Sequence, residues 1–328
     1  MSGPVATGGI TDVPGVLVGH QQGPSTGVTV LLVPEGAAAA VDVRGGPTGT
    51  RELDVLDPAN LVRRVQAICL AGGGGSGLAA ADGVVAWLAE HERGFPVGRS
   101  AAEVVPIVPT ATIADLPPAD RAQAPDAAVG YAACQAAVTG PVPVGRIGVG
   151  TGARLGSFAG AIGTAGVRLP AGPVVGALVV ANALGEPVDA DGELLAAGFA
   201  GVRPVAIGSA VAGRVGGTIA VVAVDVALDK ADCRRLAVAG HDGLARAIRP
   251  AAAGPDPVTV FALATGVRPA PATPDGGPDQ ATRDRAGLLN QLGAAAADAV
   301  ERAVALAVLG VNPADPALSP VGTRDNAP

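Results

Sequence analysis

The chain contains three near-continuous apolar runs, at residues 174–182, 205–207 and 219–224, and these constrain its fold most strongly. A strand that is covered on both faces has no side in contact with water, so its sequence is apolar throughout. We therefore expect three central strands at these places, with packed layers above and below them. Strands of this kind need helices to cover them, which predicts a layered α/β domain.

The rest of the chain supplies helices and further strands for these layers. Short β-type runs flanked by Gly and Pro predict strands at 28–33, 38–43 and 258–263. A helix is expected at 58–70, because Asp57 can cap it and Pro58 suits its first position. Apolar periodicity predicts further helices at 78–91, 127–138, 230–248 and 288–309. Segments 269–279 and 313–328 are predicted to be a mobile loop and a loose tail, so the predicted domain spans residues 1–312.

Composition argues against several classes of protein. No uninterrupted apolar run approaches the roughly 18 residues of a membrane span. The chain starts without a charged segment followed by an apolar core, so we expect no secretory leader and a cytoplasmic protein. The net charge is −7 without a basic cluster, and only four Phe, one Tyr and one Trp are present. Nucleic acid, which binds basic patches and stacking aromatic side chains, is therefore not an expected partner, and neither is a membrane.

Cysteine and histidine side chains give no sign of a metal site. Cys69, Cys134 and Cys233 are far apart and odd in number, which is typical of small buried apolar residues. The three histidines are isolated from one another and from pairs of carboxylates. Two glycine-rich loops, at 72–77 and 148–153, lack the flanking residues of nucleotide-binding motifs. These residues predict no metal and no nucleotide cofactor.

The segment 213–225 brings a hydroxyl residue, Thr218, to the start of an apolar strand after a glycine-rich approach. Glycines allow a strained turn, from which a hydroxyl can attack the carbonyl before it and cleave the chain. The freed α-amine, with an ordinary pKa of about 7.7–8.0, could then act as general base for the same hydroxyl. The alternative is a Gly-Gly turn that simply enters a buried strand.

Asn182 and Tyr131 are further candidates for a site. Asn182 ends the apolar run 174–182, where its amide could donate to an oxyanion or could simply form a turn. Tyr131 is the only tyrosine and lies in the predicted helix 127–138, where it could be an active-site phenol or a core residue. Lys230 is the only lysine, so a mechanism that needs a lysine has one candidate.

Several segments together resemble the L-aminopeptidase/D-esterase (DmpA-like) family, which includes β-peptidyl aminopeptidases and nylon-oligomer hydrolases. The similarity runs in order from about residue 9 to residue 310. It rests on the segments ITDVPGV at 10–16, GH at 19–20, VRGGPTGTRE at 43–52, LDP at 56–58, AADGV at 80–84, VPIVP at 105–109, GTGA at 150–153, VANA at 180–183 and HDGLAR at 241–246.

The resemblance implies an αββα layered fold, and a precursor that cleaves itself once between Gly217 and Thr218. The two parts would be residues 1–217 and 218–312, and Thr218 would become an N-terminal nucleophile for the hydrolysis of small peptides or amides. It also implies that Asn182 helps to stabilise the oxyanion and that Tyr131 lies in the active site. No metal or organic cofactor is implied, and the protein is expected to be a homo-oligomer, a tetramer or larger. The fold also resembles that of ornithine acetyltransferases, so acyl transfer is an alternative reaction.

Two positions depart from the family pattern. Ala159 stands where members of the family commonly carry a lysine, in a segment that reads AGAIGTA at 159–165. Alignment of the strand 221–225 without gaps places Gly217, not Thr218, at the nucleophile position. These departures leave a rival function open, that of a catalytically impaired member that serves as a scaffold or binds a small molecule.

Overall fold

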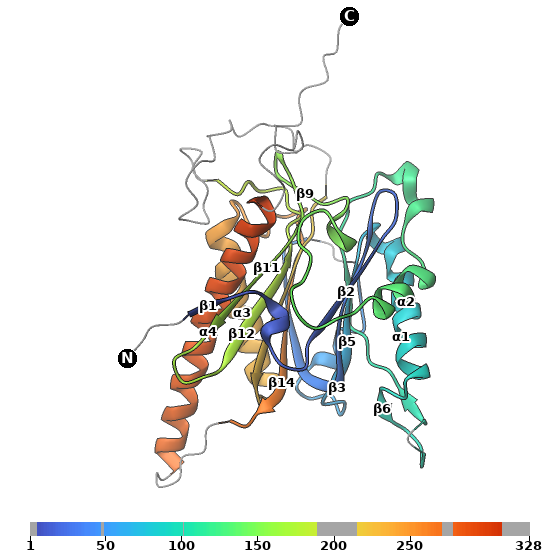
Figure 1. The fold of residues 1–328 in the computed structure, drawn as a ribbon. Coiled ribbons are helices and arrows are strands. Elements are labelled where there is room, and N and C mark those ends of the chain that lie inside the picture. Colours follow the sequence, from blue (N-terminus) through green and yellow to red (C-terminus); the bar gives the residue numbers. More distant parts are fainter. Residues whose placement is uncertain (1–4, 47–48, 101, 189–214, 271–277, 310–328) are drawn as a thin grey trace, which may run out of the picture.

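A computed structural model describes residues 5–46, 49–100, 102–188, 215–270 and 278–309. Its largest element is a continuous ten-stranded sheet, which β3 (Gly27–Arg44) bends into two packed halves. Residues 38–44 of β3 pair with β14, and residues 27–37 pair with β2 and β5. The two halves face each other, as Figure 1 shows.

The first half of the sheet carries the central strands in the order β1–β11–β12–β13–β14–β3. Only β13 and β14 are parallel among these neighbours. Their bounds are Val5–Thr7 for β1, Ile162–Arg168 for β11, Val174–Val180 for β12, Thr218–Val226 for β13 and Val258–Arg268 for β14. Every residue of β12 and β13 is buried, which confirms the predicted central strands at 174–182 and 219–224. The run 205–207 lies outside the described residues.

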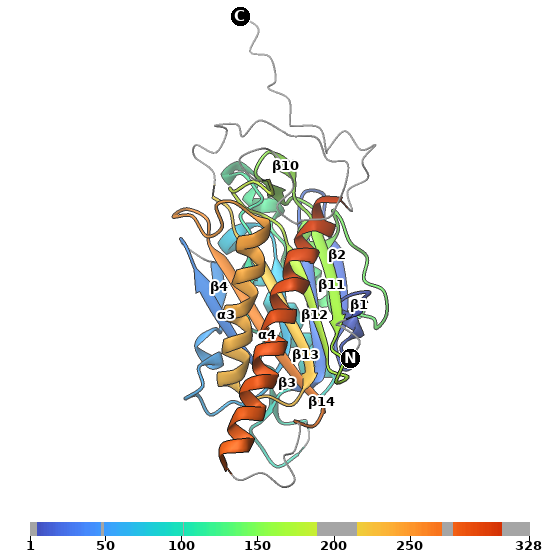
Figure 2. The ribbon, with the colours of Figure 1, turned by 90° about the vertical axis from the view of Figure 1, so that its left-hand side faces the viewer.

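The second half of the sheet contains β2, the first part of β3, β5, β8 and β4. Helices α1 (Ala80–Glu90) and α2 (Ala127–Gln135) cover its outer face (Figure 1). Helices α3 (Lys230–Ala247) and α4 (Pro278–Leu309) cover the outer face of the first half, which faces the viewer in Figure 2. The remaining strand bounds are Leu17–Gln22 for β2, Gly49–Arg51 for β4, Val65–Ala71 for β5 and Thr110–Thr112 for β8. The four layers confirm the predicted αββα fold, and the predicted helices at 78–91, 127–138, 230–248 and 288–309 are confirmed within about three residues at most ends.

Three apolar clusters hold the four layers together. The middle cluster fills the space between the two halves of the sheet, with Leu31, Ile68, Leu178 and Phe261 among its members. One outer cluster lies under α3 and α4, and the other lies under α1 and α2. Alternate residues of each central strand therefore contribute to different clusters, which lets the cluster identify the face on which a side chain lies.

The helix predicted at 58–70 is wrong. Residues 65–71 form β5, and each of its seven residues is buried, some in the middle cluster and some under α1 and α2. A short apolar run that is buried on both faces has no periodicity to tell a strand from a helix. Asp57, the predicted cap, instead accepts a hydrogen bond from the N–H of Ala59 at 2.7 Å, which closes a local turn.

The two short strands predicted at 28–33 and 38–43 are one strand, β3. Pro34, Glu35 and Gly36 lie between the two apolar runs and do not end the strand. The pairing of β3 with β5 shifts register between Leu32 and Ala37, which is an irregularity of the kind that tolerates proline and bends a strand. The same irregularity lets β3 pass from one half of the sheet to the other.

In the described parts of the chain, no helix combines the length and the apolar character needed to cross a membrane. The predicted tail at 313–328 and most of the predicted loop at 269–279 lie outside the described residues.

Candidate active site

Thr218 is the first residue of β13, and two buried glycines precede it. A Cβ on Gly216 would lie 1.9 Å from Oδ1 of Asp256, so only glycine fits there. Gly217 has a φ of +142°, a conformation that residues with a side chain rarely adopt. The predicted glycine-rich approach to the strand is therefore a steric and conformational requirement of this turn.

Three carbonyl or carboxylate groups hold the backbone at this turn. The N–H of Gly217 donates to the carbonyl of Asn182 at 2.9 Å and to Oδ1 of Asp256 at 3.0 Å. The N–H of Thr218 donates to the carbonyl of Pro257 at 3.0 Å. The hydroxyl of Thr218, which is 1% exposed, donates to the carbonyl of Asn182 at 3.2 Å. The peptide bond between Gly217 and Thr218 is thus fixed from both sides.

The side chain of Asn182 carries an N–H donor that makes no hydrogen bond in the described structure. Its side-chain oxygen accepts a hydrogen bond from the N–H of Arg154 at 3.0 Å, which sets the orientation of the amide. The Nδ2 group of the same amide is buried and has no hydrogen-bond partner among the described residues. A buried donor without a partner costs about 1–3 kcal/mol. Such a group is suited to an oxygen that arrives with a substrate.

The side chains of Asn182 and Thr218 lie on opposite faces of the sheet. Val180 pairs with Ile219 across β12 and β13, and both belong to the cluster between the two halves of the sheet. Side chains alternate between the two faces along a strand, so Asn182, two residues after Val180, and position 217, two residues before Ile219, lie on this same face. Thr218 instead pairs with Val258 of the cluster under α3 and α4, and it lines a narrow cavity with Leu244 and Ile248 of that cluster.

Position 217 therefore occupies the face of Asn182. A Cβ on Gly217 would lie 3.5 Å from Cα of Ile113 and 3.6 Å from the carbonyl oxygen of Thr112, across the gap between the two halves of the sheet. These distances are ordinary van der Waals contacts, so a side chain at 217 would meet strain from the positive φ but no steric clash. The structure brings Asn182 and Thr218 together through the Asn182 carbonyl, and not through the Asn182 amide.

Asp256 is a residue of this site that the sequence analysis did not identify. It is fully buried, and its two carboxylate oxygens accept hydrogen bonds from the N–H groups of Gly217 and Leu184, both at 3.0 Å. The carboxylate therefore ties the start of β13 to the segment after β12. A signal was present in the sequence, because an aspartate directly before Pro257 and a buried strand is well placed to accept backbone N–H groups.

Tyr131 and Lys230, the other candidates, lie elsewhere. The hydroxyl of Tyr131 on α2 donates to a carboxylate oxygen of Glu90 on α1 at 2.6 Å, in the outer helix layer, and this hydrogen bond raises the pKa of the phenol. Lys230 donates to the carbonyls of Val55 and Asp57, at 2.8 and 3.0 Å. It follows the far end of β13, about 25 Å from Thr218 at the usual rise of a strand. The structure brings neither side chain to Thr218.

Position 159, where the family resemblance leads one to expect a lysine, lies near Asn182. Ala159 is buried and pairs with Arg154 between the short strands β10 (Phe158–Ala159) and β9 (Arg154–Leu155). The N–H of Arg154 is the group that binds the Asn182 side chain. The departure from the family pattern therefore lies at the site and not at a distant surface.

Within the described ranges, no group of three or more His, Cys, Asp or Glu side chains could hold a metal ion. The three cysteines are buried and free, as the sequence predicts, and burial raises the pKa of both Cys69 and Cys134 to about 12. A thiolate is disfavoured at such positions, which fits small packing residues.

The sequence model of peptidase family S58 matches residues 8–315. The chain belongs to peptidase family S58. An uncharacterized aminopeptidase of Mycobacterium tuberculosis (strain ATCC 25618 / H37Rv) is 47% identical to this S58 chain, over 93% of the chain and 94% of the relative. A 6-aminohexanoate-oligomer endohydrolase of Paenarthrobacter ureafaciens is 34% identical, over 80% of the chain and 76% of the relative.

Solved structures agree with this assignment. A β-aminopeptidase of a Burkholderia species superposes with a TM-score of 0.66 at 27% identity, over 93% of this chain and 87% of that one. The L-aminopeptidase D-Ala-esterase/amidase of Ochrobactrum anthropi, described as a variant of the Ntn hydrolase fold, gives a TM-score of 0.65 at 24% identity, over 94% and 87%. The predicted family and the predicted αββα fold are thereby confirmed, and the family model and the aminopeptidase relative support the predicted class of aminopeptidase-type hydrolase.

Proposed function

We propose that this S58 chain hydrolyses small peptides or related amides with Thr218 as its nucleophile, after it has cleaved its own Gly217–Thr218 bond. One observation carries the proposal: the Thr218 hydroxyl and the Gly217 N–H both bind the carbonyl of Asn182, whose buried side-chain Nδ2 group has no hydrogen-bond partner among the described residues. A hydroxyl and a scissile carbonyl thus belong to one turn, and the residue that holds this turn carries a donor suited to an oxyanion.

The first step is an N→O acyl shift. The Thr218 oxygen attacks the carbonyl carbon of Gly217, the C–N bond breaks, and the hydroxyl proton passes to the departing nitrogen, which leaves an ester. Water then hydrolyses the ester, so that one part ends in the Gly217 carboxylate and the other begins with the Thr218 amine. The attacked carbon is only one peptide bond away, so the hydroxyl reaches it by a rotation of χ1, whichever face of β13 it occupies.

Cleavage also gives Thr218 a freedom that it lacks in the intact chain. An N-terminal residue can rotate about its Cα–C bond, and a rotation of about 120° moves the side chain to the place that the amine held and the amine to the place of the hydrogen on Cα. The hydroxyl can then leave the α3 side and approach the Asn182 amide between the two halves of the sheet. There the amine serves as base, and Asn182 donates to the oxyanion, a contribution of about 3–4 kcal/mol to the barrier in comparable sites.

Denaturing mass spectrometry of the purified chain tests the proposal. The wild type is expected to give two fragments, divided between Gly217 and Thr218, in place of the intact mass of 31.5 kDa. Thr218→Ala is expected to remain intact and inactive, because it removes the only hydroxyl at this turn. Thr218→Ser keeps the hydroxyl and should be cleaved, so it controls for disturbance of the strand. A wild-type chain that stays intact would refute self-cleavage.

A second candidate is an uncleaved member of the family that binds a small carbonyl compound or carboxylate at the Asn182 amide. It is favoured by Ala159 at the lysine position, and by Gly217, which puts no hydroxyl on the face of Asn182. Gly217→Ser distinguishes the two candidates. If the wild type is intact and Gly217→Ser is cleaved between 216 and 217, the chain has lost its nucleophile and the second candidate holds.

A further inference from the structure

Arg154 carries an exposed positive charge beside Asn182. It belongs to β9, which lies toward the upper end of the molecule in Figure 1. Its backbone N–H, and not its side chain, binds the Asn182 oxygen. The guanidinium makes no hydrogen bond or ion pair with any described residue. Arg154 therefore has a free charge next to the residue that the proposed reaction needs for its oxyanion.

Arg154 and Asn182 lie on the same face of the sheet. Leu155 pairs in parallel with Ala183, and both belong to the cluster under α3 and α4. The residues that precede them, Arg154 and Asn182, therefore lie on the opposite face, between the two halves of the sheet. Backbone hydrogen bonds fix this pairing, because the N–H of Ala183 donates to Arg154 at 2.9 Å and accepts none of the slack of a loop: its carbonyl binds the N–H of Gly156 at 3.0 Å.

Two carboxylates lie near the hairpin of β9 and β10, and other donors occupy both. Glu186 accepts the N–H and the hydroxyl of Ser157, in the turn between the two strands. Asp115, which faces Gly152 just before β9, accepts a hydroxyl and a backbone N–H from two loops. Neither carboxylate pairs with Arg154 in the described structure, so its guanidinium is available to a ligand.

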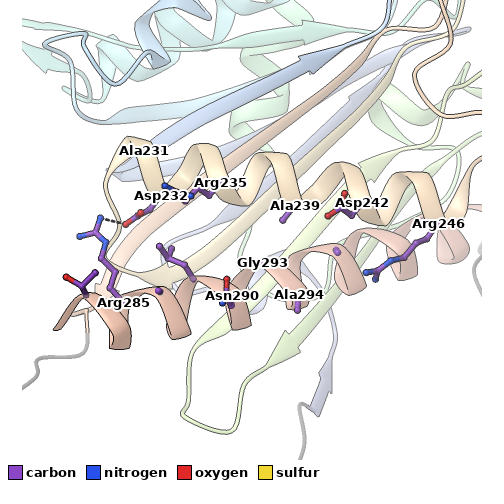
Figure 3. Close-up of a pocket in the computed structure, with 14 residues that line it drawn as sticks. Ala231, Asp232, Arg235, Ala239, Asp242, Arg246, Arg285, Asn290, Gly293 and Ala294 are labelled. Atoms are coloured by element: carbon purple, nitrogen blue, oxygen red, sulfur yellow. Dashed lines mark hydrogen bonds and ion pairs between the residues drawn. The ribbon is translucent and has the colours of Figure 1, made fainter. Parts of the chain in front are cut away.

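An exposed arginine does not by itself make a binding site, as the groove on α3 and α4 illustrates (Figure 3). Arg235 in that groove also lacks an ion pair in the part of the chain that the structure describes. Among the described residues, however, only His20 and Asn182 have a buried side-chain polar atom without a hydrogen-bond partner. Arg154 differs from Arg235 because such an atom, Nδ2 of Asn182, belongs to its neighbour on the same face.

We propose that Asn182 and Arg154 together bind a dipeptide, with its amide carbonyl at Asn182 Nδ2 and its C-terminal carboxylate at the Arg154 guanidinium. Neighbouring strands are about 4.8 Å apart, and one residue of extended chain spans about 3.5 Å, so the two ligand groups match the two side chains in spacing. A guanidinium binds a carboxylate with two parallel N–H···O bonds. The carboxylate belongs to the leaving residue, because the acyl residue of an aminopeptidase substrate carries an ammonium group, which the guanidinium repels.

The inference rests on the proposed function, for which it names the substrate class: dipeptides with a free C-terminal carboxylate. In a longer peptide this carboxylate lies further from the scissile carbonyl, and in a C-terminal amide it is absent. Both should therefore be poorer substrates. Substitution of Arg154 keeps the backbone N–H that binds Asn182, so the side chain can be changed while the anchor of the Asn182 amide remains.

Hydrolysis of alanylalanine and of alanylalaninamide, which differ only in this carboxylate, tests the inference. The kcat/KM of the wild type is expected to be about tenfold or more higher for the acid. Arg154→Met should bring the ratio of the two kcat/KM values close to one. Arg154→Lys, which keeps the charge but not the planar fork, should give an intermediate ratio. Arg99→Met removes an exposed arginine outside the site and should keep the ratio of the wild type.

The ratio distinguishes recognition of the carboxylate from a structural role. If Arg154 only supports the fold of the hairpin, Arg154→Met lowers hydrolysis of both compounds together and leaves the ratio unchanged, which overturns the inference. A wild type that hydrolyses the acid and the amide with equal kcat/KM also overturns it, while the proposed function stands.

Binding separates this inference from the proposed function. Calorimetric titration of Thr218→Ala with the same two compounds needs no catalysis, and the acid should bind about tenfold or more tighter than the amide. Adding Arg154→Met to this variant should abolish the preference. If the wild type hydrolyses neither compound but Thr218→Ala shows this preference and loses it with Arg154→Met, the proposed function is wrong and the inference holds. If neither compound is hydrolysed or bound, the inference is overturned as well.

Discussion

Substitution of Asn182 by alanine should separate catalysis from folding, because the two roles of its side-chain amide have opposite effects on stability. Loss of the side-chain oxygen leaves the Arg154 N–H without its acceptor, which costs about 1–3 kcal/mol, toward the lower end because that bond is only partly buried. Loss of Nδ2 removes a buried donor that has no partner in the described structure, which stabilises the fold by a similar amount. We therefore expect the free energy of unfolding to change by less than about 1 kcal/mol.

Hydrolysis should respond quite differently. If Asn182 Nδ2 donates only to the oxyanion, its loss removes about 2.7–4 kcal/mol of transition-state stabilisation, a fall of about 10²–10³ in kcat. KM should change little, because the interaction is absent from the bound substrate. The assay is hydrolysis of aminoacyl p-nitroanilides, normalised to the folded fraction from urea unfolding.

Asn60→Ala is a matched control for Asn182→Ala. The side-chain oxygen of Asn60 also accepts a backbone N–H, that of Val62 at 3.1 Å, in a loop outside the site. This variant should lose a little stability and keep full activity. The reasoning about Asn182 is refuted if Asn182→Ala hydrolyses substrate at the wild-type rate per folded molecule, or if it unfolds more easily by over 3 kcal/mol.

Three further predictions concern stability and reactivity. Gly216→Ala forces a Cβ to 1.9 Å from the Asp256 carboxylate and should lower the free energy of unfolding by roughly 2–3 kcal/mol. Gly254→Ala is its control: no atom lies within 4 Å of the added Cβ, so the free energy of unfolding should change by under about 0.5 kcal/mol. Burial lowers the pKa of His20 to about 4, whereas in the unfolded chain this imidazole has an ordinary pKa near 6.5. As the pH falls from 6.5 to 4, the unfolded chain therefore binds a proton at His20 that the folded chain does not, and the free energy of unfolding should fall by up to about 3 kcal/mol. His20→Gln should lack this loss in urea titrations across that pH range. All three cysteines are buried, with the pKa of each thiol raised by burial, so a thiol reagent at pH 8 should label none of them until the chain is unfolded.

Sequence patterns could predict the parts of the fold that are dominated by burial. Continuous apolar runs located β12 and β13, because a strand that is covered on both faces has a purely apolar sequence. Periodicity located α3, and the structure adds its N-cap: the side chain of Asp229 accepts the N–H of Asp232. The same reasoning failed for β5, since seven buried residues carry no periodicity. It also divided β3, because Pro34 and Gly36 resemble a turn when the irregular pairing with β5 is unknown.

The site was predictable in its parts but not in its geometry. The glycines before Thr218 and the amide of Asn182 could be identified, because strained turns and strand ends have local signatures. Which face each side chain occupies depends on the register between β12 and β13, and a shift by one residue moves a side chain to the other face. Asp256 belongs to the site through hydrogen bonds to backbone groups distant in sequence, so its place before Pro257 and a buried strand indicates an acceptor but not which N–H groups it binds.

Sequencing of the N-termini present in the purified protein tests the account most directly. If Thr218 is the nucleophile of this S58 chain, a second N-terminus that begins Thr-Ile-Ala-Val-Val must accompany the N-terminus of the intact start, in equal amount. A single N-terminus, or a new one that begins with Gly217, would contradict the central claim that Thr218 cleaves the bond before it.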